Sequence, residues 1–253
     1  MNTLSPPTLL VLWEDRYCAE LDRLLRRSVR HICPINLPLN KESAEGNGNF
    51  ENYLKTAWPN ARTRGRLRTP PIDYLICVAD ADRASECCKS ISKPTQSTDL
   101  TEWVKAANEQ WTAKLRSLTT LDPERIYGRF FRWNKESVLA ACYDSDDVLS
   151  KLGVTNQASQ ASLDRFLDKC KPVNPRKAED ADFTNQFQKP GNCLKEGFKS
   201  VDISWPGKND QVIDDAIGKA SEVHLDKLLK RLPDLRMLAE LVIRFDSSAQ
   251  EEE

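Results

Sequence analysis

Apolar and polar positions along the chain alternate between short hydrophobic runs and longer amphipathic stretches. Residues 8–13 (TLLVLW) and 73–79 (DYLICVA) are continuous apolar runs, typical of strands buried on both faces. Residues 15–30 carry apolar side chains every three or four positions, which predicts an amphipathic helix. Residues 125–131 (RIYGRFF) alternate in polarity and predict a third strand. The pattern favours an α/β fold with a mostly parallel sheet flanked by helices.

The remaining chain is predicted to be helical or irregular. Residues 36–71 and 154–210 are rich in polar residues, glycine and proline and are expected to be largely irregular. The acidic tail 246–253 (DSSAQEEE) is expected to be disordered. We predict one domain over residues 1–245, with its core at residues 8–153 and a helical C-terminal extension. Helices are expected at 50–58, 83–91, 99–118, 136–142, 146–153, 210–219, 223–231 and 234–244.

Composition places the chain among globular proteins. Of its 253 residues, 40% are hydrophobic and 30% are charged, with a mean hydropathy of -0.58 and a net charge of -1. Its apolar runs are shorter than the ~20 residues that a membrane span requires. The first residues lack the basic region of a signal peptide. We therefore expect a cytoplasmic protein with no membrane partner.

The eight cysteines do not change this interpretation. Cys77 and Cys142 lie inside apolar stretches, where a reduced cysteine serves as a small hydrophobic side chain. The sequence has no C-x-x-C pair, and neither histidine has a cysteine at zinc-finger spacing. We therefore expect reduced cysteines and no structural zinc.

Acidic residues directly follow two of the predicted strands. Glu14 comes after the first, and Asp80 and Asp82 come after the second. If these strands are parallel neighbours, the three carboxylates meet at the edge of the sheet where α/β folds bind ligands. Oxygen ligands without histidine or cysteine favour Mg²⁺ or Mn²⁺. The alternatives are that Asp80 and Asp82 cap the following helix and that Glu14 faces solvent.

Further charged residues could complete such a site or bind its substrate. Glu86 follows Asp82 by four residues, and Glu136 begins a predicted helix, where the helix dipole also favours a carboxylate. Residues 62–68 (RTRGRLR) carry an arginine at every second position. If this segment is extended, the four side chains share one face and could bind a phosphate backbone. They could equally belong to a solvated loop. The candidate nucleic-acid-binding residues are Arg62, Arg64, Arg66, Arg68 and Arg83.

The order of these features resembles the Toprim domain of topoisomerases, primases and overcoming-lysogenization-defect nucleases. The resemblance lies in the strand before Glu14, in LICVADADR, and in WNKESVLAACYDSDDVLSKLG with Glu136 and Asp144. Residues 174–177 (NPRK) and the C-terminal LLKRLPDLRMLAELV are similar to small stand-alone bacterial Toprim proteins associated with ATPases. The chain departs from the pattern at Asp15, where Toprim proteins often have glycine.

The resemblance implies a Toprim-like, Rossmann-like fold and a Mg²⁺-dependent nuclease, plausible as a toxic or antiviral defence effector under an ATPase partner. It implies catalysis by Glu14, Asp80, Asp82 and Glu136, and metal binding by the first three with Glu86. DNA and RNA both stay open as the nucleic-acid substrate, as does a homodimer. The alternatives are a Toprim module that binds nucleic acid or a protein without cleaving, and another D-x-D phosphoryl-transfer enzyme.

Overall fold

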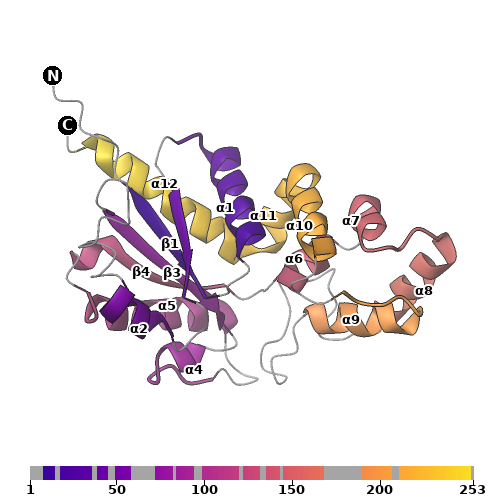
Figure 1. Ribbon diagram of the computed structural model, residues 1–253, viewed down its shortest axis with the longest axis horizontal. Helices are drawn as coiled ribbons and strands as arrows, with labels where there is room; N and C mark the ends of the chain where they lie inside the picture. The colour runs from indigo at the N-terminus through magenta and orange to yellow at the C-terminus, as the bar shows by residue number, and fades with distance from the viewer. Residues whose placement is uncertain are drawn as a thin grey trace.

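A four-stranded parallel β-sheet lies in the left half of the computed structural model as drawn in Figure 1. The structure describes residues 8–14, 18–35, 39–44, 49–57, 72–81, 84–93, 99–119, 122–131, 135–142, 145–167, 190–206 and 211–251. The strand order is β2-β1-β3-β4, and each neighbouring pair is parallel. The predicted α/β fold is confirmed as a Rossmann-like layout. The strands are β1 (Leu9–Trp13), β2 (Leu39–Ser43), β3 (Tyr74–Asp80) and β4 (Ile126–Phe131).

The two central strands are those that the apolar runs predict. Every residue of β1 is buried, and only the two end residues of β3 are partly exposed. Leu9 pairs with Tyr74 and Trp13 pairs with Val78, so β1 and β3 are parallel neighbours. A strand that has neighbours on both sides and helices on both faces must be apolar throughout, which explains the continuous hydrophobic runs.

Helices cover both faces of the sheet (Figure 1). One layer contains α1 (Ala19–Ile32) and α12 (Pro233–Glu251), and the Phe245 ring of α12 stacks on Tyr74 of β3 with centroids 4.3 Å apart. The opposite layer contains α5, and its Trp111 stacks on Phe130 of β4 at 4.6 Å. The helical elements of this second layer are α2 (Asn49–Asn52), η1 (Tyr53–Ala57), α4 (Ala84–Cys87) and α5 (Leu100–Arg116).

The contact between α5 and β4 depends on a glycine. A Cβ atom at Gly128 would lie 2.8 Å from two atoms of the Trp111 indole and 3.0 Å from Leu115. The main-chain N–H of Gly128 also donates a hydrogen bond of 2.9 Å to the Thr112 hydroxyl. The helix can therefore approach the strand closely only because this position has no side chain.

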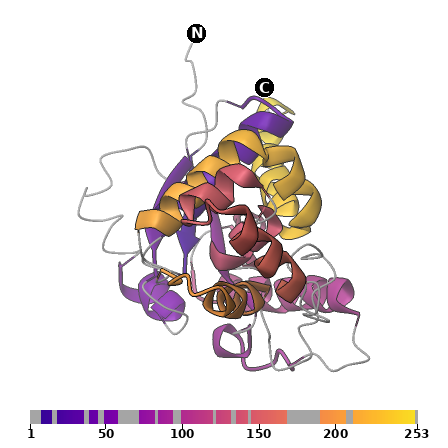
Figure 2. The ribbon, with the colours of Figure 1, turned by 90° about the vertical axis from the view of Figure 1, so that its right-hand side faces the viewer.

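The other helices form a group beyond the carboxyl ends of the strands (Figures 1 and 2). Buried leucine, isoleucine and phenylalanine side chains join this group to the rest of the core, among them Leu163, Phe198 and Ile217. Within the described part of the chain, no helix is long and apolar enough to cross a membrane. The helices of the group are α6 (Lys135–Cys142), α7 (Asp146–Lys151), α8 (Gln157–Leu167), α9 (Pro190–Ser200), α10 (Gln211–Val223) and α11 (Leu225–Arg231).

Five features differ from the expectations. The edge strand β2 and the helices α8 and α9 lie in regions predicted to be largely irregular. The tail predicted to be disordered instead continues α12 to Glu251, because a helix that is already formed extends without a new nucleation cost. Buried Cys193 is disulfide-bonded, which corrects the expectation of reduced cysteines, and its partner lies outside the described residues.

Candidate functional site

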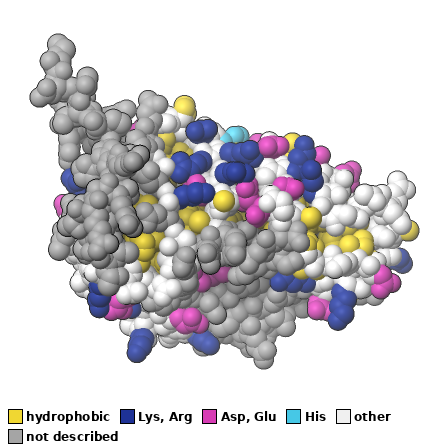
Figure 3. All heavy atoms as spheres, viewed as in Figure 1, with side chains coloured by type: hydrophobic (Ala, Val, Ile, Leu, Met, Phe, Trp, Pro, Cys, Tyr) yellow, Lys and Arg dark blue, Asp and Glu magenta, His cyan; other side chains and the backbone are white. Residues whose placement is uncertain are grey.

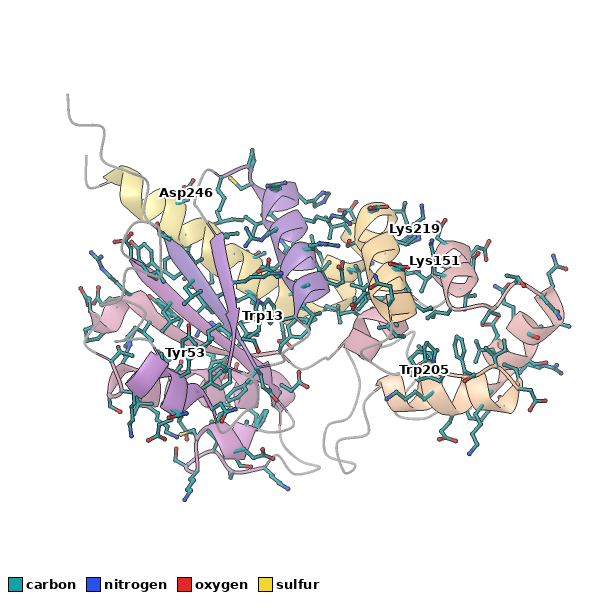
Figure 4. The ribbon with its side chains drawn as sticks, in the orientation of Figure 1. Trp13, Tyr53, Lys151, Trp205, Lys219 and Asp246 are labelled. Atoms are coloured by element: carbon teal, nitrogen blue, oxygen red, sulfur yellow. The ribbon has the colours of Figure 1, made fainter. Side chains whose placement is uncertain are left out.

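Glu14 and Asp80 lie side by side at the carboxyl edge of the sheet. The main-chain N–H of Glu14 donates to the Val78 carbonyl at 2.9 Å, so the pairing of β1 with β3 continues one residue past β1. The main-chain N–H of Asp80 donates to Oε2 of Glu14 at 2.8 Å. Both residues are partly buried. Trp13, labelled in Figure 4, marks this end of β1 near the centre of the molecule.

This position is the switch point of the sheet. From β1 the chain passes through α1 to β2 on one side, whereas from β3 it passes through α5 to β4 on the other side. The two crossovers run towards opposite edges of the sheet. Because crossovers between parallel strands are right-handed, α1 and α5 therefore lie on opposite faces. Open α/β sheets bind ligands at such a switch point, beyond the carboxyl ends of the strands.

A third carboxylate lies on the α5 side of this edge. Burial raises the pKa of the Cys87 thiol, and the carboxylates of Glu14 and Glu86 add to that rise. Both carboxylates are therefore near Cys87, although Glu86 is exposed on α4. Lys114 of α5 adds a positive charge to this group, because its Nζ donates a hydrogen bond of 2.8 Å to the Cys87 carbonyl. Sequence reasoning did not identify Cys87 and Lys114, since neither belongs to a motif.

Beside this group a small hollow opens between α2, α4 and α5. Phe50 and Trp111 form its apolar wall, while Glu51, Glu86 and Lys114 supply charge. Nζ of Lys114 lies 3.6 Å from an oxygen of Glu51. The hollow continues the candidate site towards the α5 face and combines an aromatic surface with both signs of charge.

The residues around the edge of the sheet fit a hard divalent cation better than zinc. Glu14 and Asp80 offer carboxylate oxygens, and the Cys87 thiol, on which the Glu14 charge acts, has a raised pKa and stays protonated. Carboxylates are ligands that Mg²⁺ and Mn²⁺ prefer, whereas zinc favours thiolate and imidazole. Among the described residues, no group of three or more histidines, cysteines, aspartates and glutamates is arranged to hold a metal. Asp82, the third predicted ligand, lies outside the described residues.

The structure places some of the other predicted residues and leaves others undescribed. Glu136 is the second residue of α6, which begins four residues after β4 ends at Phe131. Phe131 pairs with Asp80, so the start of α6 lies near the same edge of the sheet, although the side chain of Glu136 is outside the described part. Also outside it are Asp144, residues 174–177, and the arginines Arg62, Arg64, Arg66, Arg68 and Arg83.

A serine and a histidine also meet away from the sheet, but their geometry does not favour nucleophilic catalysis. The hydroxyl of buried Ser145 lies 2.5 Å from Nε2 of His224, and an oxygen of Asp147 lies 3.5 Å from the same nitrogen. A serine triad needs its carboxylate on the opposite ring nitrogen, where it orients the imidazole. We interpret this contact as one that ties α7 to the start of α11.

Within the described structure, Glu14 and Asp80 at the switch point are thus the residues whose arrangement best suits metal binding or catalysis. Their fold context is general, because many activities use the same edge of an α/β sheet. Comparison of the chain with protein-family models, with curated proteins and with solved structures finds no match in any of the three.

Proposed function

We propose that the protein is a Toprim-type, metal-dependent nuclease that hydrolyses nucleic-acid phosphodiesters. The observation that supports the proposal is the contact between Glu14 and Asp80 at the switch point of a parallel sheet. The contact brings two acidic residues to one edge of the sheet, and carboxylate oxygens are the ligands that Mg²⁺ and Mn²⁺ prefer. Asp82, two residues beyond Asp80, would add a third carboxylate.

In this mechanism the protein residues mainly bind and orient. Glu14, Asp80 and Asp82 would hold Mg²⁺ or Mn²⁺, with Glu86 or Glu136 completing the set. The bound cation would lower the pKa of a water molecule and stabilise charge on the departing oxygen. The hydrogen bond from the Asp80 N–H fixes one oxygen of Glu14, so the Glu14 carboxylate has a set direction before any ligand arrives.

The biological setting is part of the same proposal. We propose that the protein acts in the cytoplasm as a toxic or antiviral effector whose activity an ATPase partner controls. Support comes from the resemblance of LICVADADR and the downstream blocks to small Toprim proteins associated with ATPases. A bacterial growth assay that expresses the protein with and without a candidate ATPase partner tests this setting separately from the chemistry.

A hydrolysis assay tests the proposed activity. Labelled single-stranded and double-stranded DNA and RNA are incubated with the purified protein and Mg²⁺, Mn²⁺ or a chelator. We expect cleavage of at least one substrate that depends on the metal and is lost in Asp80→Asn. The matched control is Asp215→Asn, an exposed aspartate on α10 that should keep full activity. Binding of nucleic acid without cleavage would instead support the non-cleaving Toprim module.

A further inference from the structure

Three arginines from three different elements gather at the outer edge of the sheet. Arg116 ends α5, Arg129 lies on β4 and Arg244 lies on α12. The guanidinium carbon of Arg129 is 5.2 Å from the centroid of the Tyr127 ring, and that of Arg116 is 5.8 Å from it. Because β4 is the last strand of the described sheet, Arg116 can reach around its edge to the ring. Tyr127 therefore has two cations packed against it.

These cations have little negative charge beside them: Glu109 acts on Arg129 but forms no ion pair with it. Among the described residues, no carboxylate forms an ion pair with Arg116 or Arg129. Arg129 donates from Nη1 to the Gly128 carbonyl at 2.8 Å, and the buried Nε of Arg116 has no hydrogen-bond partner. Burial lowers the pKa of Arg129, and the neighbouring charge of Arg244 lowers it further. Like charges held close together are costly unless an anion binds beside them.

The arginines on α1 provide a contrast. Figure 3 shows Lys and Arg side chains gathered over α1 and α10 with acidic side chains among them. Arg26 donates to Asp22 at 2.6 Å, and Arg27 pairs with Glu222 at 3.1 Å. These cations are already offset by carboxylates of the same surface. The cluster around Tyr127 is therefore the better candidate for an external anion.

We propose that Arg116 and Arg129 bind a phosphate group at the outer edge of β4, with Arg244 adding positive charge. A phosphate supplies several acceptor oxygens, so it can accept from the fork of each guanidinium. It also offsets the repulsion between the arginines. The two arginines need little reorganisation to bind it, because the Tyr127 ring already holds them in place.

The phosphate could come from a nucleic-acid backbone or from a free phosphorylated small molecule. Arg129 pairs with Val78, two residues before Asp80. Strand geometry thus puts the Cα atoms of Arg129 and Asp80 about 8 Å apart, so the nucleic-acid source would extend the substrate path from the proposed catalytic edge. That source rests on the proposed function. The phosphate site itself does not.

The site is tested by thermal melting of the full chain with inorganic phosphate, compared with sodium chloride at equal ionic strength. We expect phosphate to raise the Tm of the wild type beyond the effect of chloride. The double variant Arg116→Gln with Arg129→Gln should bind phosphate at least about tenfold more weakly. The matched control is Arg125→Gln, at the residue just before β4, because Arg125 already has a carboxylate partner, Asp73, at 3.7 Å. Arg125→Gln should respond to phosphate as the wild type does.

Two outcomes would overturn the proposal: a wild type that responds to phosphate no more than to chloride, and a folded double variant with the wild-type response. The first measurement needs no variant, so a folding defect cannot obscure it. If the Gln variant misfolds, the Lys pair Arg116→Lys with Arg129→Lys keeps the charge and removes the fork, and it should still weaken phosphate binding.

Fluorescence anisotropy of a labelled single-stranded oligonucleotide, measured in a chelator so that it is not cleaved, distinguishes a nucleic-acid backbone from a small molecule as the source of the phosphate. If the backbone is the ligand, the double variant should flatten the log–log salt dependence of binding by about 1.4, or about 0.7 for each lost contact. If a small molecule is the ligand, the double variant should lose its phosphate response and keep the wild-type affinity for the oligonucleotide. Neither readout depends on hydrolysis, so both still test the phosphate site if the protein has no nuclease activity.

Discussion

The main-chain N–H of Asp80 donates a hydrogen bond of 2.8 Å to the Glu14 carboxylate, joining the ends of two neighbouring strands that are 66 residues apart in the sequence. The bond holds the Glu14 carboxylate against the main chain at the end of β3. Glu14 and Asp80 are also the residues to which the proposed function assigns the metal. Local structure and the proposed chemistry thus depend on the same contact.

Substitutions at Glu14 should distinguish the effect of its hydrogen bond on stability from the effect of its charge. Glu14→Ala leaves the partly buried Asp80 N–H without its acceptor and should lower the free energy of unfolding by about 1–3 kcal/mol. Glu14→Gln keeps an acceptor of the same length and should be the more stable of the two variants by at least about 1 kcal/mol. Urea unfolding measures the difference. Equal stability of the two variants would show that the hydrogen bond does not hold this edge together.

Two glycine substitutions should change stability in opposite directions. Gly128→Ala forces a Cβ atom against Trp111 and should destabilise the protein by about 1–3 kcal/mol. Gly218→Ala places its Cβ 3.8 Å from Glu20 inside α10, with ordinary contacts, and should stabilise by about 0.5–1 kcal/mol. Thermal melting of both variants provides the measurement. A stabilising Gly128→Ala would contradict the close approach of α5 to β4.

Stability should fall at alkaline pH because of two buried thiols. Burial raises the pKa of Cys77 and of Cys87 in the folded protein, so both stay protonated while the thiols of the unfolded chain ionise. Their contribution is fully present below a pH of about 8.5 and is lost as the pH rises above that value, by up to about 1.4 kcal/mol per pH unit for each thiol. Urea unfolding across this range should show a shallower loss for Cys77→Ala. The half-buried Cys33 provides the control, and Cys33→Ala should keep the wild-type slope.

The arginine-rich segment before β3 should contribute to nucleic-acid binding. Replacing Arg62, Arg64, Arg66 and Arg68 with serine should weaken binding regardless of base sequence. Each lost phosphate contact should reduce the log–log salt slope by about 0.7–0.9. Anisotropy titrations over a range of salt concentrations measure both effects. Unchanged affinity together with lost binding of an ATPase would assign these arginines to a protein interface.

The sequence predicts the centre of the fold well because that centre is apolar. The continuous hydrophobic runs of β1 and β3 have no alternative to burial, so the pattern locates both strands to within a residue or two. Once the two are parallel neighbours, the positions of Glu14 and Asp80 after their ends follow from strand geometry. This part of the candidate site could therefore be anticipated before any coordinates.

Other features depend on tertiary contacts that leave little trace in the sequence. The polar edge strand β2 is a strand because β1 offers it a partner, and its sequence, LNKES, contains only one large apolar residue. Arg116 and Arg129 meet only because α5 packs against β4 and both guanidinium groups lie against the Tyr127 ring. Cys87 similarly approaches Glu14 through folding alone. No motif connects the members of either group.

The account's central claim is that Glu14 and Asp80 together hold a divalent cation, and titration of the purified protein with Mn²⁺ in a calorimeter tests it most directly. We predict binding by the wild type, an affinity at least about tenfold lower for Glu14→Gln and for Asp80→Asn, and wild-type affinity for Glu240→Gln, an exposed glutamate on α12. Equal Mn²⁺ affinity in all four proteins, or no binding by the wild type, would contradict the claim.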